Sequence, residues 1–226
     1  MISVVSAQFY GGDKDIKKLV NQPAFDGVEY ILFTNRPEAA KDTIWKPVVV
    51  ETDNPRMTAR DIKINIHMHL PESNYWLWLD ANMEIKVDPN TLVEKYMKRH
   101  SICLMPHPER HHWLEEAQFL VARDQSLAQP LQELINYLYK EGFISNTLFE
   151  TGVLLRKNNT EILKLNEYWW DMVSNICIRD QVSFPYAAWK AGVAVNTFPG
   201  TNSINPLRYQ LKKYLPQWEE IIRAWN

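Results

Sequence analysis

The sequence predicts an α/β fold with a mostly parallel sheet that is covered by helices on both faces. Strand-like runs alternate with helical patterns along the chain, as in β-α-β units. The run YWLWL at 75–79 is apolar without alternation, which is typical of a strand buried on both faces. The 226 residues, 46% of them hydrophobic and 23% charged, show no internal repeat and no domain boundary. We therefore expect a single domain over residues 1–226.

The elements follow one another in a regular order. The strand-like segments are 2–9, 29–35, 44–51, 75–81, 83–87, 101–107, 149–157 and 193–198. The helical segments are 13–22, 54–70, 88–100, 112–123, 126–141, 161–176 and 180–192, with a broken helix over 211–226. Asn54-Pro55 and Asp88-Pro89 each combine a capping side chain with a proline suited to the first helical position.

Composition excludes several classes of protein. A net charge of −2 argues against a nucleic-acid-binding surface. No G-x-G-x-x-G or G-K-[ST] occurs, which removes the dinucleotide and P-loop fingerprints. Cys103 and Cys177 stand far apart in apolar contexts, so no disulfide framework or zinc ribbon is expected. The chain begins with a strand-like run and contains no membrane-length apolar stretch, from which we expect a soluble, cytoplasmic protein without a membrane span.

The strand at 75–79 runs directly into Asp80, and Asn82 follows. A carboxylate is costly to bury, so we expect Asp80 at the carboxyl edge of the sheet, where α/β folds bind ligands. Asp80 and Asn82 therefore stand where such a ligand would bind, with Asp80 either paired or bound to a metal. The alternative is a simple turn after a strand, because Asp and Asn favour turns.

A basic stripe marks the helix before this strand. Arg56, Arg60, Lys63 and His67 fall within an arc of about 60° on a regular helix. Apolar residues flank the stripe on both sides, so we expect it to face a ligand and to bind a diphosphate. The alternative is that the stripe pairs with buried carboxylates or reaches solvent.

Three further segments carry polar groups. His111 and His112 stand four residues before Glu115 and Glu116, a spacing that fits ordinary helix pairs better than a zinc site. LFETGVLLRK places Glu150 and Gly152 at the start of a strand, where glycine allows close approach to a ligand. RDQVSFPYA places Asp180 and Gln181 at a helix start, with Asp180 as the expected N-cap.

In this order, YILFTNR, ARDIK, YWLWLDANMEIKVDP, HPERHHWLEEA, ETGVLLRKN and RDQVSFPYA resemble the GT-A (Rossmann-like) nucleotide-sugar glycosyltransferases. The similarity points to the glycosyltransferase-like domain of plant mucilage and pectin enzymes, over roughly residues 30–190. The resemblance implies a hexosyl- or pentosyltransferase that uses a UDP- or GDP-linked sugar and a glycan or glycoconjugate acceptor.

The resemblance also implies a role for each site residue. Asp80 and Asn82 would hold Mn²⁺, or Mg²⁺, against the donor diphosphate, in a variant of the Asp-x-Asp motif. The other donor-binding residues would be Ala7, Gln8, Thr34, Asn35, Arg56, Arg60, Lys63 and Gly152. The residues around the transferred sugar, and the catalytic candidates, would be Glu150, Asp180 and Gln181.

Two departures from the family pattern leave the metal and the mechanism open. The second ligand is an amide, and no histidine follows His112 to supply a third ligand. Metal-independent activation by the basic stripe is therefore an alternative. Retention, towards which the resemblance leans, would place Gln181 beneath the anomeric carbon, whereas inversion would require Asp180 or Glu150 as a base.

Two other functions compete with glycosyl transfer. One is a nucleotide-sugar or carbohydrate-binding module with little turnover. The other is a nucleotide-sugar hydrolase or nucleotidyltransferase, which would need more carboxylates around the metal.

Overall fold

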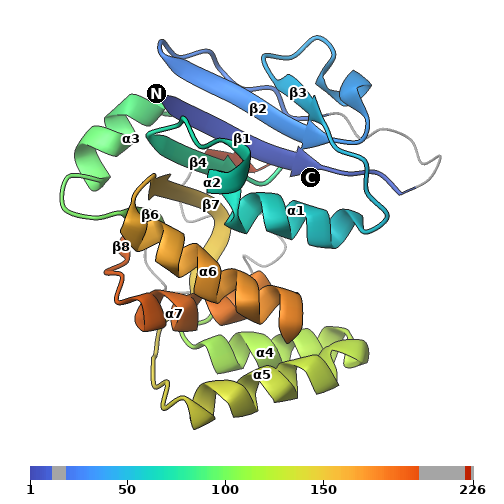
Figure 1. The fold of residues 1–226 in the computed structure, drawn as a ribbon, viewed down its shortest axis with the longest axis vertical. Helices are drawn as coiled ribbons and strands as arrows, with labels where there is room; N and C mark the ends of the chain where they lie inside the picture. The colour runs from blue at the N-terminus through green and yellow to red at the C-terminus, as the bar shows by residue number, and fades with distance from the viewer. Residues whose placement is uncertain (12–18, 199–221, 225–226) are drawn as a thin grey trace.

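The computed structural model describes residues 1–11, 19–198 and 222–224, and it confirms the predicted α/β fold. A seven-stranded sheet has the order β3-β2-β1-β4-β7-β6-β8 (Figure 1). Its strands are β1 Ile2–Gln8, β2 Val28–Thr34, β3 Lys46–Val49, β4 Tyr75–Leu79, β6 Ile102–Pro106, β7 Phe149–Lys157 and β8 Asn196–Thr197. Neighbouring strands are parallel except at β7, which runs antiparallel to β4 and β6.

The reversed direction of β7 determines where the site lies. Leu79 at the end of β4 pairs with Val153, and Met105 near the end of β6 pairs with Glu150. The first residues of β7 therefore lie at the same edge as the carboxyl ends of β4 and β6.

Helices cover both faces of the sheet, as predicted. The α-helices are α1 Pro55–Ile64, α2 Ile66–His69, α3 Pro89–Tyr96, α4 Trp113–Arg123, α5 Ala128–Lys140, α6 Thr160–Asn175 and α7 Asp180–Ala191. Two 3-10 turns span Pro37–Ala40 and Gln125–Leu127. Among the described helices, none combines the length and the apolar character that a membrane crossing requires.

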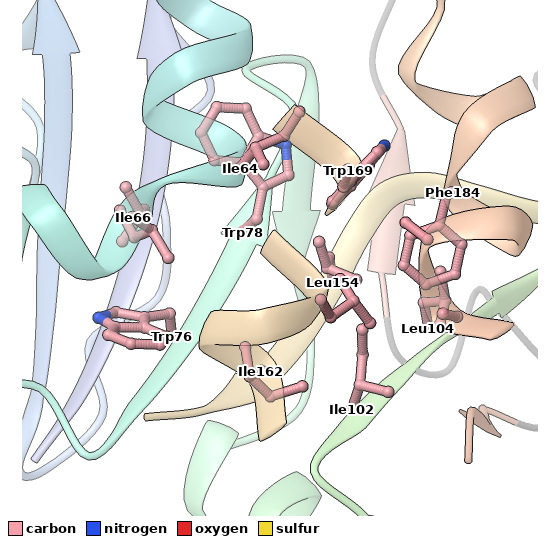
Figure 2. Close-up of a cluster of buried hydrophobic side chains, with 14 of the residues drawn as sticks. Ile64, Ile66, Trp76, Trp78, Ile102, Leu104, Leu154, Ile162, Trp169 and Phe184 are labelled. Carbon is pink, nitrogen blue, oxygen red and sulfur yellow. The ribbon is translucent and has the colours of Figure 1, made fainter. Parts of the chain in front are cut away.

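Successive side chains of β4 point to opposite faces of the sheet, so they belong to two separate parts of the core. Trp76 and Trp78 lie with the residues of α1, α2, α6 and α7 (Figure 2), whereas Leu77 and Leu79 pack with α3 and the short strand β5, Met83–Ile85. The pair α4 and α5 forms a further layer, which packs on α6 and α7 through residues such as Trp113, Leu134 and Val182 (Figure 1). The last four residues of β4, from Trp76 to Leu79, are all buried.

The predicted helix over 54–70 is in fact two helices, α1 and α2, which meet at Asn65. Asn54 caps α1 as expected, because its side chain accepts a hydrogen bond from the Met57 amide at 3.2 Å. At the other end, the buried Arg156 guanidinium donates to the carbonyls of Lys63 and Ile64. A cation that binds the last carbonyls of a helix both satisfies them and stabilises the end of the helix.

Other boundaries also differ from the prediction. The helix from Asp88 ends at Tyr96, and the strand over 193–198 is reduced to Asn196–Thr197. Most of the predicted helix 13–22 lies outside the described residues, as does most of the helix over 211–226. Residues 222–224 of that tail are a strand, β9, because their backbone pairs with β5 in a second, antiparallel sheet.

Candidate functional site

Asp80 lies at the carboxyl edge of the sheet, as predicted, and its carboxylate is held in place. Trp78 Nε1 donates to Asp80 Oδ1 at 2.9 Å. The Asp80 carbonyl accepts from the Met83 amide at 2.9 Å, so the chain also forms a turn here. Asn82 in this turn is exposed. The turn and the proposed ligand site are thus compatible, because the turn uses the backbone and leaves Asp80 Oδ2 at the edge.

Gly152 makes room for Asp80 and Met83. The Asp80 amide donates to the Gly152 carbonyl at 2.9 Å, which brings the two backbones together. A Cβ at residue 152 would lie 2.7 Å from Met83 Cε and 3.1 Å from Asp80 Oδ2. The described contacts around this glycine are therefore those of the protein's own Asp80 and Met83 side chains.

A buried ionic network connects α1, β7 and α7. Lys63 Nζ donates to Asp180 Oδ2 at 2.7 Å and to Thr151 Oγ1 at 3.0 Å. Thr151 Oγ1 donates to Asp180 Oδ2 at 3.2 Å, and Arg60 Nε lies 3.1 Å from Asp180 Oδ1 without hydrogen-bond alignment. Burial alone would raise the pKa of Asp180, but Lys63 and Arg60 hold that pKa well below its usual range. Asp180 is therefore ionised, and its contacts hold its side chain in place.

The expectation that Asp180 caps a helix is wrong. Arg179 occupies the N-cap position of α7, and Asp180 is the first helical residue. The Asp180 side chain points towards Lys63 because two cations and a hydroxyl group stabilise its negative charge more strongly than the backbone amides of the helix start would. Gln181, the next residue, is partly exposed at the same helix start.

The basic stripe divides into paired and unpaired cations. Lys63 is buried against Asp180, as the alternative to phosphate binding foresaw. The guanidinium groups of Arg56 and Arg179, by contrast, make neither a hydrogen bond nor an ion pair with any described residue. Burial lowers the pKa of Arg179, Asp180 opposes this, and the nearby Arg56 lowers it further. Ser126 lowers the pKa of the nearby Asp124 carboxyl most, and the charges of Arg56 and Arg179 add to this, so Asp124 is also close to both arginines. Arg56 and Arg179 are the candidates for binding an anion at this edge.

Arg179 was missed as a site residue by the sequence analysis. The available signal was its position beside Asp180, which brings its charge to the same end of α7 as the predicted catalytic pair. Its nearness to Arg56 depends on how α1 packs against the end of α6, which the sequence does not reveal.

Glu150, near the start of β7, lies at the same sheet edge, close enough to Asp80 for the charge of Asp80 to act on it. It is partly exposed and has no hydrogen-bond or ion-pair partner within the described ranges. Burial raises the pKa of Glu150 to about 8, and the charges of Asp80 and Glu116 add to the rise, while Lys63 partly opposes it. A carboxyl group with this pKa can exchange a proton near neutral pH.

The segment after β6 forms a structural unit, but not through the expected helix pairs of His111 with Glu115 and His112 with Glu116, because both histidines precede the first residue of α4. His112 Nδ1 accepts from the Leu114 amide at 3.0 Å, and Glu115 accepts from the amides of His111 and His112, which together cap α4. Arg110 Nε donates to the buried Glu116 at 2.6 Å.

His107, at the end of β6, contributes an uncharged ring to this unit. Its Nδ1 accepts from the amides of Glu109 and Arg110, and burial lowers the pKa of His107 to about 3.

The predicted nucleoside-binding residues lie at the ends of β1 and β2. The Asn35 amide group exchanges two hydrogen bonds with the Tyr10 backbone, and Thr34 Oγ1 bonds to the Arg36 backbone. These two side chains therefore shape the loops. Gln8 Oε1 is buried without a hydrogen-bond partner, as is the Ser6 hydroxyl on the same side of β1, whereas Ala7 faces the α1 side.

The ligands that could hold a metal are few. Within residues 1–11, 19–198 and 222–224, no cluster of three or more His, Cys, Asp or Glu is arranged to hold a metal ion. Asp80 offers one oxygen at the edge, and Asn82 is exposed beside it. Such a sparse set of hard oxygen ligands fits Mg²⁺ or Mn²⁺ shared with substrate phosphates better than a closed protein cage.

Fold and site together define an α/β domain that gathers carboxylates and unpaired arginines at the carboxyl edge of its sheet. The model of the TOD1/MUCI70 glycosyltransferase-like domain family matches residues 33–203, and the chain belongs to this family. The chain is also similar to the "Probable hexosyltransferase MUCI70" of Arabidopsis thaliana, with 25% identity over 167 residues. That alignment covers 68% of this chain and 29% of the relative, so the chain spans less than a third of that protein's length.

Proposed function

We propose that the protein is a glycosyltransferase that moves a sugar, most simply a hexose, from a nucleoside diphosphate donor to a hydroxyl group of a glycan or glycoconjugate. The observation that carries this proposal is the arrangement of Asp80, Glu150 and Asp180 beside unpaired arginines at one edge of the sheet. Family membership and the printed name of the relative support the same chemistry.

The donor diphosphate is assigned to the unpaired arginines. Arg56 and Arg179 can each form bidentate hydrogen bonds to phosphate oxygens without breaking an existing contact. Arg60 adds charge while it also fixes Asp180. Lys63 acts mainly by holding Asp180, because its ammonium group is already satisfied. Gln8, with its buried unpartnered oxygen, is suited to a polar group of a uridine or guanosine.

A divalent cation, Mn²⁺ or Mg²⁺, would be held by Asp80 and Asn82 together with the diphosphate. When bound, such an ion offsets negative charge on the leaving diphosphate. Trp78 orients Asp80 for this task, and the absence of a side chain at Gly152 leaves room for the Asp80 carboxylate.

The two remaining carboxyl groups have different roles. Asp180 is a poor base because its pKa is depressed, so it is suited to accept hydrogen bonds from sugar hydroxyls. Glu150 is suited to take the proton of the acceptor hydroxyl, as an inverting reaction requires. In a retaining reaction, Gln181 would lie beneath the anomeric carbon and Glu150 would only bind the acceptor. The anomeric configuration of the product, read by NMR coupling constants, separates these two cases.

A panel of UDP and GDP sugars with and without Mn²⁺ tests the proposal. We expect one donor to release its nucleoside diphosphate, and Asp80→Ala to abolish this release in a folded protein. Donor binding without release in the presence of acceptor glycans would favour a binding module. Release to water alone, unchanged by any acceptor, would favour a hydrolase.

A further inference from the structure

A groove of about 790 Å³ lies along the outer side of α6, beside α2, away from the sheet edge described above. Side chains from α2 and from successive turns of α6 line it. Those that carry its chemistry are His67, Met68, Glu167, Trp170, Asp171 and Asn175. We propose that this groove binds uncharged sugar residues of an oligosaccharide acceptor. This inference rests on the proposed function, since it concerns the acceptor of that reaction.

The structure positions the His67 ring through a buried relay. Arg156 Nη1 donates to Asn166 Oδ1 at 2.8 Å, which fixes the orientation of the Asn166 amide. The Asn166 nitrogen then lies 3.2 Å from His67 Nδ1 and donates to it, so the ring proton is on Nε2. Burial and the nearby Arg156 lower the pKa of His67, which keeps the ring neutral. Its Nε2–H has no partner among the described residues and is available to a hydroxyl oxygen in the groove.

The other groups in the groove match the surface of a sugar. Trp170 is partly exposed and Met68 is 73% exposed, which offers an indole and a thioether chain to the apolar face of a pyranose ring. The exposed carboxylates of Glu167 and Asp171 accept hydrogen bonds from sugar hydroxyls, and the Asn175 amide can do so as well. Among the lining side chains, the two carboxylates outnumber the single ammonium group, that of Lys164. The resulting negative charge disfavours an anionic glycan, so we assign uncharged sugars to the groove.

The groove is placed to lead an acceptor to the reacting sugar. On α6, Asn175 stands only five residues before Asp180. On the other wall, His67 belongs to α2, which directly follows α1, the helix that carries Arg60. Both walls therefore continue towards the sheet edge, so an oligosaccharide in the groove could extend its end towards Glu150.

Binding of the labelled 226-residue chain to printed oligosaccharides tests this assignment. The array carries neutral gluco-, galacto-, manno- and xylo-oligosaccharides, with oligouronates as the charged comparison. We expect the parent to bind neutral members, and Trp170→Ala to weaken binding by at least about tenfold, as for a central aromatic contact. Glu167→Ala changes an exposed side chain, so it should leave the fold intact. This variant should weaken binding by about threefold or more.

Two control variants separate a lost contact from a damaged fold. Trp189→Ala removes a tryptophan that is 47% exposed on α7, outside the groove, and should bind like the parent. Trp170→Phe keeps an aromatic face and should retain most of the binding. Thermal melting of each variant identifies any that has unfolded.

The result that overturns the assignment is absence of neutral glycan binding, binding of oligouronates alone, or equal binding by the parent, Trp170→Ala and Glu167→Ala. Release of nucleoside diphosphate by the parent is measured separately. Glycan binding that depends on Trp170 without any donor consumption would refute the proposed function and leave the groove as a sugar site. Donor consumption without such binding would refute the assignment of the groove as a sugar site, but not the proposed function.

Discussion

The substitution Asp180→Asn should destabilise the fold strongly, although asparagine has nearly the same shape. The side chains of Lys63 and Asp180 are 2% and 6% exposed and lie 2.7 Å apart. Asparagine keeps an oxygen that can accept a hydrogen bond from Lys63, but it carries no negative charge, so the buried Lys63 ammonium and Arg60 both lose their nearest counter-charge. Breaking a buried ion pair by removing one partner costs about 3–5 kcal/mol, so we expect a loss of unfolding free energy of that size.

Urea unfolding at neutral pH, followed by circular dichroism, measures this loss. The matched control is Asp53→Asn, which changes an exposed aspartate and should shift stability by less than about 0.5 kcal/mol. The double variant Lys63→Met/Asp180→Asn removes both charges and should be more stable than the sum of the two single losses predicts. A loss below about 1 kcal/mol in Asp180→Asn, or additive losses in the double variant, would refute the proposed coupling.

The same network has a consequence for acid stability. The pKa of Asp180 is depressed in the folded protein relative to about 3.9 in an unfolded chain. Its contribution is therefore complete above that value and disappears as the pH falls towards the folded pKa. The parent should lose stability more steeply than Asp180→Asn between about pH 5 and pH 2, and parallel acid profiles would contradict this.

Three further predictions concern the sheet edge. Arg179→Ala should raise the donor dissociation constant by about tenfold or more in calorimetry, without lowering the melting temperature, because the guanidinium makes no hydrogen bond or ion pair with a described residue. Gly152→Ala should reduce turnover and cost about 1–3 kcal/mol, because its Cβ would press on Asp80 and Met83; unchanged turnover would mean that the Asp80 position is not critical. Asp80→Asn should lower the pKa of Glu150 from about 8 in carboxyl-carbon NMR, because a like charge is removed; an unchanged pKa would place the two groups further apart.

Much of the fold could be predicted from local patterns. The Asn54-Pro55 start of α1 and the unbroken apolar run of β4 depend on neighbouring residues alone, and both appear where expected. The break at Asn65 could not be predicted, because the basic and apolar stripes continue through it. It is associated with Arg156, which stands 91 residues later and binds the last carbonyls of α1. The strand character of residues 222–224 likewise depends on a distant partner, β5.

The position of the site could be predicted from the sequence, but the ion pairs within it could not. The sequence places Asp80 at the carboxyl edge of the sheet, and the resemblance implies that Glu150 and Asp180 surround the transferred sugar. The antiparallel course of β7 brings Asp80 and Glu150 to the same edge. Which cation pairs with which carboxylate depends on the packing of α1 against β7 and α7. Lys63 was therefore assigned to phosphate on the same grounds as Arg56, although only Arg56 is unpaired.

The pairing of Lys63 changes how the whole basic stripe should be understood. A stripe of like charges between apolar flanks is costly in a folded core unless each charge has a partner. Here Asp180 pairs with Lys63 and with Arg60. Arg56, which is exposed, and Arg179 make no hydrogen bond or ion pair with a described residue, although the charge of Asp124 acts on both. These two arginines are therefore the ones that we propose for an anionic ligand. Asp180, which the resemblance assigns to catalysis, thus identifies Lys63 as a structural cation, and it leaves Arg56 and Arg179 as the proposed ligand-binding ones.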